Sequence, residues 1–450
     1  MSRVLPPGPP GRLFFGNLQD FTRDTLRYMT ESRQYGDIVL IRFGPYKGFL
    51  VYSPEYFHQV LVTDADHYHK TTATKRALEM LVGSGLFTND GDSWRRQRKL
   101  VQPAFHTRRI GAYGDVMVEF TEDLLNEWHE QTEMDMDRAM TDLTMRIIAK
   151  TLFDANLQDT ADIGDAITAA LHEVDDRFNR LVLLPDWAPT SSNRVMKDSV
   201  AKLDAIIQRF IDDRRASGED TGDLLSMLLM ARDEDTDGVM TDKQVRDEAM
   251  TLFGAGHETT AHALSWTWYA LSQNPAVETR LHDELARVLG GRAPTIEDLP
   301  NLPYTEQVVK EALRMYPPAW TTTREVVDEV EIGGYSIRKG EVVVLPIYAM
   351  HHDPRYFPEP ERFDPERFSP ERERDIPKYA YLPFGGGPRV CIGNAFALME
   401  ARLIVATMAQ RYTFSVAPGQ VIEPERMFTL RPKYGMRMIV HDRMPETAMA

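Results

Sequence analysis

The chain has 450 residues, with 52 Lys or Arg against 68 Asp or Glu, which gives a formal net charge of −16. This acidic balance argues against nucleic acid or an anionic membrane as the main partner. Hydrophobic residues make up 42%, as in globular chains with a sizeable core, but no run approaches the ~18 apolar residues of a membrane span. A single cysteine forbids an intrachain disulfide and fits a reducing compartment, so we expect a cytoplasmic protein without a membrane anchor.

The first half of the chain predicts a small sheet followed by helices. Two β-rich runs within 37–52 flank Gly44-Pro45 and predict a hairpin, after which Ser53-Pro54 begins a helix. From about 92 to 315 the pattern is almost wholly helical. We expect breaks in this stretch at Pro103, Pro185, Pro189, Gly218 and Gly238.

The second half returns to short strands over 325–350, with turns at Gly333-Gly334 and Lys339-Gly340. The segment 351–378 is rich in proline and charge and lacks periodicity, which indicates an ordered or disordered loop. No linker divides the chain, so we predict one domain over 1–450. Its class is mainly helical α+β, with small sheets at the start, late middle and end.

A long helix is predicted near the middle of the sequence. Thr241 and Gln244 form a capping-box pattern, and the helical run continues for about 32 residues, or roughly 48 Å, to Asn274-Pro275. Glycines and paired threonines in 253–260 favour a weakened or opened helix, in which a glutamate beside a threonine holds water and relays protons. The alternative is a small-residue patch against which another helix packs closely.

The lone cysteine, Cys391, lies in a glycine-rich loop that runs from 381 to 393, and a helix is predicted from Asn394 to about Tyr412. A helix N-terminus stabilises a thiolate, so we expect a permanently ionised sulfur. Such a sulfur is either a nucleophile or a metal ligand. The nucleophile needs a histidine base, and distant histidines such as His257 and His351 leave that alternative open.

The residues around the cysteine favour the ligand. Phe384, Gly387, Arg389 and Gly393 complete the pattern Phe-x-x-Gly-x-Arg-x-Cys-x-Gly around Cys391. This loop, at 384–393, resembles the haem-binding loop of the cytochrome P450 monooxygenases. The resemblance implies haem b as cofactor, Cys391 as its axial thiolate, and Arg389 on a haem propionate. It also implies that Phe384 and the glycines shape the packing and hydrogen bonds of the sulfur.

A second motif of this family lies in the long helix. The run from Ala255 to Thr260 is similar to the oxygen-activation motif Ala/Gly-Gly-x-Asp/Glu-Thr-Thr. By this resemblance Glu258 and Thr259 deliver protons during dioxygen activation, and Ala255 lies over the haem face where the substrate approaches.

Charged residues in two further places match the family. Glu311-x-x-Arg314, with Arg367 in a Pro-Glu-Arg-Phe run, resembles the buried ion network that locates the cysteine loop. We therefore interpret these three residues as structural. Trp94-x-x-x-Arg98 resembles the element that contacts a haem propionate, as Arg324 should also do because an arginine fork suits a carboxylate.

Two runs in the same regions resemble metal-binding motifs. His257 and His262 are five residues apart and diverge by ~140° on a helix, so they do not form a zinc-protease site. The run 233–238 imitates the front of a calcium loop, but position twelve is Gln244, so we predict an acidic surface turn.

Six cations and no acid lie between Ser93 and Gly114: Arg95, Arg96, Arg98, Lys99, Arg108 and Arg109. The default interpretation is a solvated basic face. The sharper hypothesis is a docking patch for an acidic electron carrier near the cysteine side of the haem.

Together the motifs identify the chain as resembling a soluble, bacterial-type member of the family. Such a monooxygenase uses O2 and electrons from a ferredoxin- or flavodoxin-type donor with its reductase. Largely apolar segments expected at the pocket suit a fatty acid, terpenoid or carotenoid. The alternatives are a peroxygenase or isomerase of the same haem-thiolate type, and a cysteine hydrolase or haem-free binding protein. The candidate pocket segments are 78–87, part of 169–184, Phe253, 319–323 and 428–430.

Overall fold

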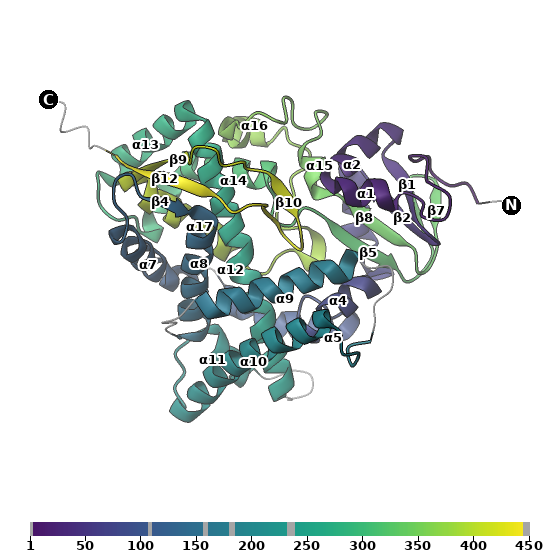
Figure 1. Ribbon diagram of the computed structural model, residues 1–450, viewed down its shortest axis with the longest axis horizontal. Helices are drawn as coiled ribbons and strands as arrows, with labels where there is room; N and C mark the ends of the chain where they lie inside the picture. Colours follow the sequence, from purple (N-terminus) through teal and green to yellow (C-terminus); the bar gives the residue numbers. More distant parts are fainter. Residues whose placement is uncertain (1–2, 107–109, 156–160, 180–184, 232–238, 444–450) are drawn as a thin grey trace.

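The computed structural model describes residues 3–106, 110–155, 161–179, 185–231 and 239–443. Figure 1 shows a helix-rich part built around α12 and, beside it, a sheet that lies towards the N-terminus. This architecture confirms the predicted α+β class, in which helices dominate. In the part of the chain described, no helix is long and apolar enough to cross a membrane.

The helices follow the apolar periodicity of the sequence over most of the stretch from 92 to 315. The α-helices are α1 (Leu18–Arg23), α2 (Thr25–Ser32), α3 (Pro54–His58), α4 (Thr72–Val82), α5 (Gly91–Val101), α7 (Gly114–Asn126), α8 (Met136–Phe153), α9 (Ala161–Asn179), α10 (Ser191–Ser217), α11 (Leu224–Met230), α12 (Asp242–Gln273), α13 (Pro275–Leu289), α14 (Pro303–Met315), α15 (Ile347–His351), α16 (Pro370–Glu373) and α17 (Asn394–Arg411). Short 3-10 and π turns connect some of them, namely η1 (Arg33–Tyr35), η2 (Gln59–Thr63), η3 (Ala65–His67), η4 (Gln102–Phe105), η5 (Gly111–Tyr113), η6 (Ile296–Asn301), η7 (Pro365–Phe368) and η8 (Gly387–Arg389).

The main sheet has the order β1-β2-β8-β5-β3. Strands β1 and β2 pair antiparallel across Gly44-Pro45, which confirms the predicted hairpin, and β2 pairs parallel with β8. Strands β6 and β7 form a second hairpin, in which Gly333 and Gly334 have φ of 54° and 80°, as a two-residue turn of this type requires. The strands of these two sheets are β1 (Ile38–Phe43), β2 (Tyr46–Val51), β3 (Tyr68–His69), β5 (Thr322–Val326), β6 (Val330–Ile332), β7 (Tyr335–Ile337) and β8 (Val342–Leu345).

The C-terminal strands form two further sheets, of which one contains a strand from the predicted helical stretch. In that sheet β12 lies between β4 and β9, and Arg437 of β12 pairs with Asp135 of β4. The three residues of β4 are too few to show an alternating pattern. They form a strand because they pair with β12, about 300 residues away in the sequence. The strands are β4 (Glu133–Asp135), β9 (Tyr412–Val416), β10 (Pro424–Arg426), β11 (Leu430–Pro432) and β12 (Arg437–Asp442).

The long central helix has the predicted bounds. Thr241 caps α12 in a capping box with Gln244, and the helix ends before Asn274, after 32 residues. One difference concerns its middle: α12 is a continuous α-helix through 253–260, so the expected opening is absent. The hydroxyls of Thr259 and Thr260 bond back to the carbonyls of Ala255 and Gly256, at 2.8 and 3.2 Å.

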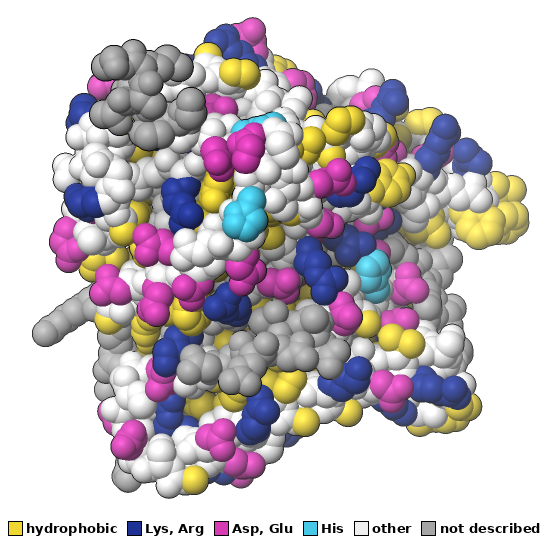
Figure 2. All heavy atoms as spheres, turned by 60° about the vertical axis from the view of Figure 1, so that its left-hand side comes forward, with side chains coloured by type: hydrophobic (Ala, Val, Ile, Leu, Met, Phe, Trp, Pro, Cys, Tyr) yellow, Lys and Arg dark blue, Asp and Glu magenta, His cyan; other side chains and the backbone are white. Residues whose placement is uncertain are grey.

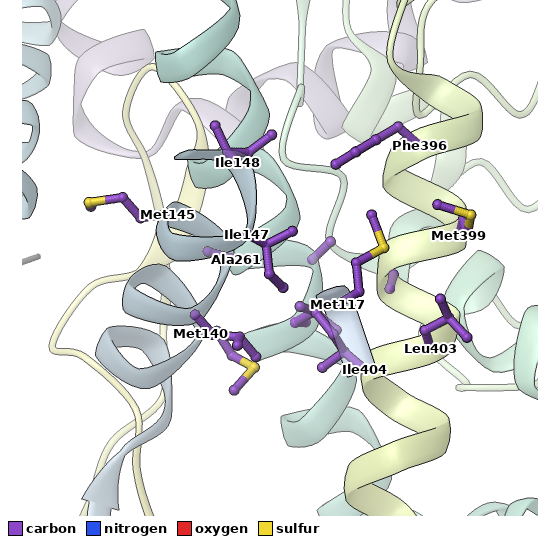
Figure 3. Packing of buried hydrophobic residues seen from close by; sticks show 14 of the residues in the cluster. Met117, Met140, Met145, Ile147, Ile148, Ala261, Phe396, Met399, Leu403 and Ile404 are labelled. Carbon is purple, nitrogen blue, oxygen red and sulfur yellow. The ribbon is translucent and has the colours of Figure 1, made fainter. Parts of the chain in front are cut away.

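The hydrophobic core joins α7, α8, α12 and α17. Figure 3 shows Met117, Ile147 and Ile404, from α7, α8 and α17, pointing into one space beside Ala261 of α12. A Cβ on Gly256 would lie 2.7 Å from Ile148, so α8 packs closely on the small residues of α12. The alternative, a small-residue patch against which another helix packs, is therefore the correct one at this glycine, and the packing fixes α12 within the core.

The segment 351–378 is an ordered loop. It contains η7 and α16, and it buries Asp353, Arg367 and Phe368. Its order comes from side chains that reach distant elements, which local periodicity does not reveal. The predicted break at Gly238 and the front of the calcium-like run lie outside the described residues.

Candidate active site

The cysteine loop approaches its neighbours so closely that particular positions must be glycine. Gly387 has φ of 69°, and a Cβ there would lie 1.9 Å from the carbonyl oxygen of Leu61. The amide of Cys391 donates to the carbonyl of Phe384 at 2.9 Å, and Gly393 is the N-cap of α17. The loop is thus a rigid turn that ends at a helix N-terminus, as predicted.

Without the cofactor, the surroundings of Cys391 favour its neutral thiol over the thiolate. Cys391 keeps exposed surface, yet the surrounding protein removes enough water to raise the pKa of its thiol. The backbone of Gly393 and the charge of Arg98 act in the opposite direction, but burial outweighs them. The helix N-terminus favours the thiolate, as expected, while removal of water from the sulfur opposes it.

Four cations gather beside the loop. Arg98 donates to the carbonyl of Val390 at 2.7 Å, and Arg389 binds Asp90 and lies 4.2 Å over the ring of Trp94. Burial, with the nearby charge of Arg389, lowers the pKa of Arg324 to about 10. The pKa of Lys70 is also lowered, by burial and then by the charges of Arg324 and Arg389.

This cluster carries more positive than negative charge. Asp90 receives Arg389 and Lys75, whereas no carboxylate among the described residues forms an ion pair with Arg98, Arg324 or Lys70. Partly buried cations without an acid favour an anionic ligand. The two propionates of haem b supply such charge beside the cysteine, so the residues present fit the cofactor that the resemblance implies.

Four residues that the sequence predicts at one site do lie near one another, namely Trp94, Arg98, Arg324 and Arg389. Lys70 and Asp90 lie with them and were not predicted. Neither residue belongs to a motif with a recognisable spacing. Only the fold shows that Asp90 binds Arg389 and that Lys70 lies near the same guanidinium.

The middle of α12 presents a second group of predicted site residues. Ala255 is exposed although this part of the helix is otherwise mostly buried, and Glu258 and Thr259 are partly exposed. Burial raises the pKa of Glu258, while the charge of His262 and a hydrogen bond with Thr429 lower it. A carboxyl with a raised pKa can take up and give up a proton nearer to neutral pH.

Polar groups continue behind Glu258. Thr429 lies 3.1 Å from Nδ1 of His262, whose Nε2 lies 3.8 Å from a carboxylate oxygen of Asp137. Burial lowers the pKa of His262 to about 4 and raises that of Asp137 to about 7. Nδ1 of His257 instead faces the carbonyl of Phe253 at 2.9 Å. Within the described ranges no three His, Cys, Asp or Glu side chains cluster as metal ligands.

The predicted ion network is confirmed. Glu311 receives two hydrogen bonds from Arg314, at 2.7 and 2.9 Å, and one from Arg367 at 3.3 Å, all among buried side chains. Burial raises the pKa of Glu311 against the opposing pull of Arg314. His351, which the sequence analysis did not assign to this network, extends it: the amide of Leu382 donates to its Nε2 at 2.9 Å. The network thereby reaches the beginning of the cysteine loop.

The predicted basic stretch is less uniform than its sequence. Arg95 pairs with Asp92 and Asp66, and Arg98 turns inward to the cysteine loop, while Arg108 and Arg109 lie outside the described residues. Arg96 and Lys99 keep exposed surface on α5. On the face shown in Figure 2, Lys and Arg are interspersed with Asp and Glu, so that face offers no extended basic surface for nucleic acid.

Comparisons with known proteins agree with this geometry. A family model described as Cytochrome P450 matches residues 6–439. Cyclooctatin synthase from Streptomyces melanosporofaciens is 39% identical over 94% of this chain and 92% of its own. Cyclooctat-9-en-7-ol 5-monooxygenase of the same organism is 38% identical over 92% and 90%. The crystal structure of the cytochrome P450DA heme domain superposes with a TM-score of 0.89, at 27% identity, over 99% of both chains.

The chain therefore belongs to the cytochrome P450 family. It is an oxidoreductase of the monooxygenase type with haem b as its cofactor, and it uses O2, an apolar substrate and electron-donor partners.

Proposed function

We propose that this monooxygenase hydroxylates a C–H bond of a terpenoid, with electrons from a separate ferredoxin- or flavodoxin-type donor. The observation that carries the proposal is the cysteine loop, whose lone sulfur lies beside a cluster of cations at the start of α17. We further propose that 1–450 acts as one domain in the cytoplasm. The family match over 6–439 and the absence of any second cysteine support this.

The residues of this chain take distinct roles in the proposal. Cys391 ligates the haem iron, and Arg98, Arg324 and Arg389 hold the propionates, with Trp94 stacked on Arg389. The rigid turn formed by Phe384, Gly387 and Gly393 fixes where the sulfur points. Bound haem supplies an iron centre that activates O2 with a thiolate donor.

The face of α12 contributes protons and shape. Glu258 takes up a proton and passes it towards the Thr259 hydroxyl, which its bond to the carbonyl of Ala255 holds at 2.8 Å. The small side chain of Ala255 leaves room for the substrate. This intact acid and hydroxyl pair favours a monooxygenase over a peroxygenase, because a peroxide-driven reaction needs no such proton delivery.

The terpenoid class is supported by the relatives and by the pocket segments. Homologues of this chain oxidise terpenoids, and one bears the name cyclooctat-9-en-7-ol 5-monooxygenase. Phe87 and Phe428, from two of the expected pocket segments, lie with ring centroids 5.8 Å apart and present aromatic surface. Residues 180–184 of a third segment lie outside the described residues.

The substrate class is tested by titrating the haem-loaded protein with cyclooctat-9-en-7-ol, palmitate and β-carotene. A substrate that displaces water from the haem moves the Soret band to shorter wavelength. We expect a saturable shift with the terpenoid at a concentration at least about tenfold below that needed for palmitate, equivalent to ~1.4 kcal/mol of affinity. A tighter response to palmitate would contradict the terpenoid assignment. Because β-carotene is itself a tetraterpenoid, a tighter response to it would narrow the assignment to carotenoids.

The site of electron entry gives a second prediction. Helix α5 contacts the cysteine loop through Arg98. Its exposed residues Arg96 and Lys99 therefore lie on the same side of the proposed haem site as Cys391. Because an acidic carrier would be steered by these charges, R96E/K99E should slow reduction by a ferredoxin about tenfold at low salt. The difference should shrink as salt is added.

The control is Arg287→Glu, a charge reversal at an exposed position of α13. This helix lies far from α5 in Figure 1. Stopped-flow reduction under carbon monoxide measures both variants. Equal rates for R96E/K99E and the wild type at low salt would refute docking at α5.

A further inference from the structure

The loop between α4 and α5, residues 83–90, is attached to the N-terminal half of α12 by two adjacent carboxylates. The amide of Ser84 donates to Asp247 at 3.0 Å, and the amide of Leu86 donates to Glu248 at 3.0 Å. Asp247 is 2% exposed and Glu248 is fully buried. Buried carboxylates that receive backbone amides make strong, directional bonds.

The loop backbone lies directly on the helix. A Cβ on Gly85 would lie 2.1 Å from the Thr251 hydroxyl, and one on Gly83 would lie 2.3 Å from the Asp247 carboxylate. Gly83 also has φ of 54°, which favours glycine. The attachment therefore depends on side chains of α12 and on the absence of side chains in the loop.

The far end of the same loop reaches the cysteine loop. The carbonyl of Asn89 accepts from Arg389 at 2.9 Å, and Asp90 binds the same guanidinium. Between the two ends of the loop, the side chain of Gln97 on α5 donates to the carbonyl of Ser84 at 2.9 Å. It also accepts from the side-chain amide of Asn89 at 2.6 Å. One short segment thus connects α12 with the proposed propionate site.

The attachment shares a face of α12 with the proposed active site. Residues 247, 251, 255 and 258 are spaced three or four positions apart, so they lie along one side of the helix. At 1.5 Å per residue, Ala255 is roughly 10 Å along the axis from Glu248. Phe87, the next residue after Leu86, packs against Phe428.

We propose that Asp247 and Glu248 are positioning residues that hold the loop 83–90 against α12 and thereby set one wall of the substrate pocket beside Ala255. The part concerning the pocket rests on the proposed function. The attachment of the loop to α12 does not.

The surroundings of Glu248 make the attachment sensitive to pH. Its second oxygen has no hydrogen-bond partner, and burial, with the charge of Asp247, raises its pKa to about 7. The other charges nearby are Lys243 and Arg246, which pair with Asp247, and Asp204 of α10, which pairs with Arg246.

The direction of the pH effect follows from the linkage between protonation of Glu248 and opening of the loop. Opening the loop would hydrate Glu248 and return its pKa towards the ordinary value near 4.5. The closed loop therefore binds the proton more tightly, so this contribution to closure is complete below about pH 4.5 and is lost as pH rises from there to about 7. The opening equilibrium should increase by up to about tenfold per pH unit between about pH 4.5 and 7, and should level off above pH 7, where Glu248 is ionised in both states.

Hydrogen exchange of the haem-loaded protein tests this proposal without substrate or turnover. Protection factors, which remove the intrinsic pH dependence of exchange, are measured for peptides that cover 83–90. In Glu248→Ala, which removes the acceptor of the Leu86 amide, we expect protection to fall about tenfold or more. In Glu248→Gln, which keeps an acceptor but does not titrate, protection should become independent of pH between about 5 and 7.5, whereas in the wild type it should fall as pH rises to about 7.

The matched control is Glu278→Gln on α13, where burial likewise raises the pKa of a glutamate to about 7. It should leave exchange of 83–90 unchanged. Unchanged protection in Glu248→Ala, or a wild-type pH profile in Glu248→Gln, would overturn the attachment whether or not the substrate is a terpenoid.

The effect on the pocket is measured with two haem ligands of different size. The Kd of imidazole should stay within twofold of wild type in Glu248→Ala, while that of bulky 4-phenylimidazole should change at least threefold. A merely destabilised protein would not separate the two probes. Equal changes for both would refute the role of these carboxylates in shaping the pocket.

Discussion

Replacement of Cys391 by serine should abolish hydroxylation and remove the strongly red-shifted Soret band of the reduced carbon monoxide complex. The chain has no second cysteine, and the sulfur is the one soft donor at the start of α17. A neutral hydroxyl donates far less electron density to iron than a thiolate, so it does not support O–O cleavage. The absorbance spectrum after dithionite reduction under carbon monoxide measures the outcome.

Two controls sharpen this test. Val390→Ala alters the neighbouring side chain and keeps the carbonyl that receives Arg98 at 2.7 Å, so its spectrum should match the wild type. Because the sulfur keeps exposed surface, iodoacetamide should label haem-free protein once, and haem should block this labelling. A retained red shift in Cys391→Ser, or labelling that haem does not prevent, would make a nucleophilic cysteine the better interpretation.

Glu311→Gln should lower the free energy of unfolding by about 3–5 kcal/mol, because it leaves two guanidinium groups buried without their counter-charge. Total stabilities are only about 5–15 kcal/mol, so much of the variant should fail to retain haem. The mechanism is specific, since Arg314 also donates to the carbonyl of His351 at 2.9 Å and His351 receives the amide of Leu382. Loss of the network therefore loosens the segment that leads into the cysteine loop.

Denaturant unfolding followed by tryptophan fluorescence and by the Soret band measures this change. Glu371→Gln, an exposed glutamate on α16, is the matched control and should stay within about 0.5 kcal/mol of wild type. If Glu311→Gln were as stable as Glu371→Gln, the ion network would not be what locates the cysteine loop.

Local sequence signals predicted those parts of the fold that depend on local chemistry. The capping box at Thr241, the proline after Asn274 and the apolar periodicity between them are enough to bound α12. The glycines of 384–393 likewise predict a tight loop before α17, since few other residues adopt the backbone angles found at Gly387. These features lie within a few residues of one another, so they can be predicted without tertiary information.

Other features escaped the sequence because their causes lie between distant residues. Strand β4 exists through its pairing with β12. His351 gains its place from a contact with Leu382, and Lys70 from contacts with Asp90 and the ring of Phe87. The same limit explains the corrected expectation about α12. Local propensity predicts an opening there, whereas packing on α8 acts more strongly. At Cys391 the helix N-terminus and burial act in opposite directions on the pKa of the thiol, and burial has the larger effect in the protein without haem.

The sequence by itself determined the tight loop that carries the lone cysteine, the long helix with its acid and hydroxyl pair, and the family to which these motifs belong. Only the tertiary structure decided which cations surround Asp90, and that Asp247 and Glu248 hold the loop 83–90. The physical reason is that a motif encodes side chains at fixed spacing along one element. Burial, charge balance and the attachment of a loop depend instead on which elements the fold brings together.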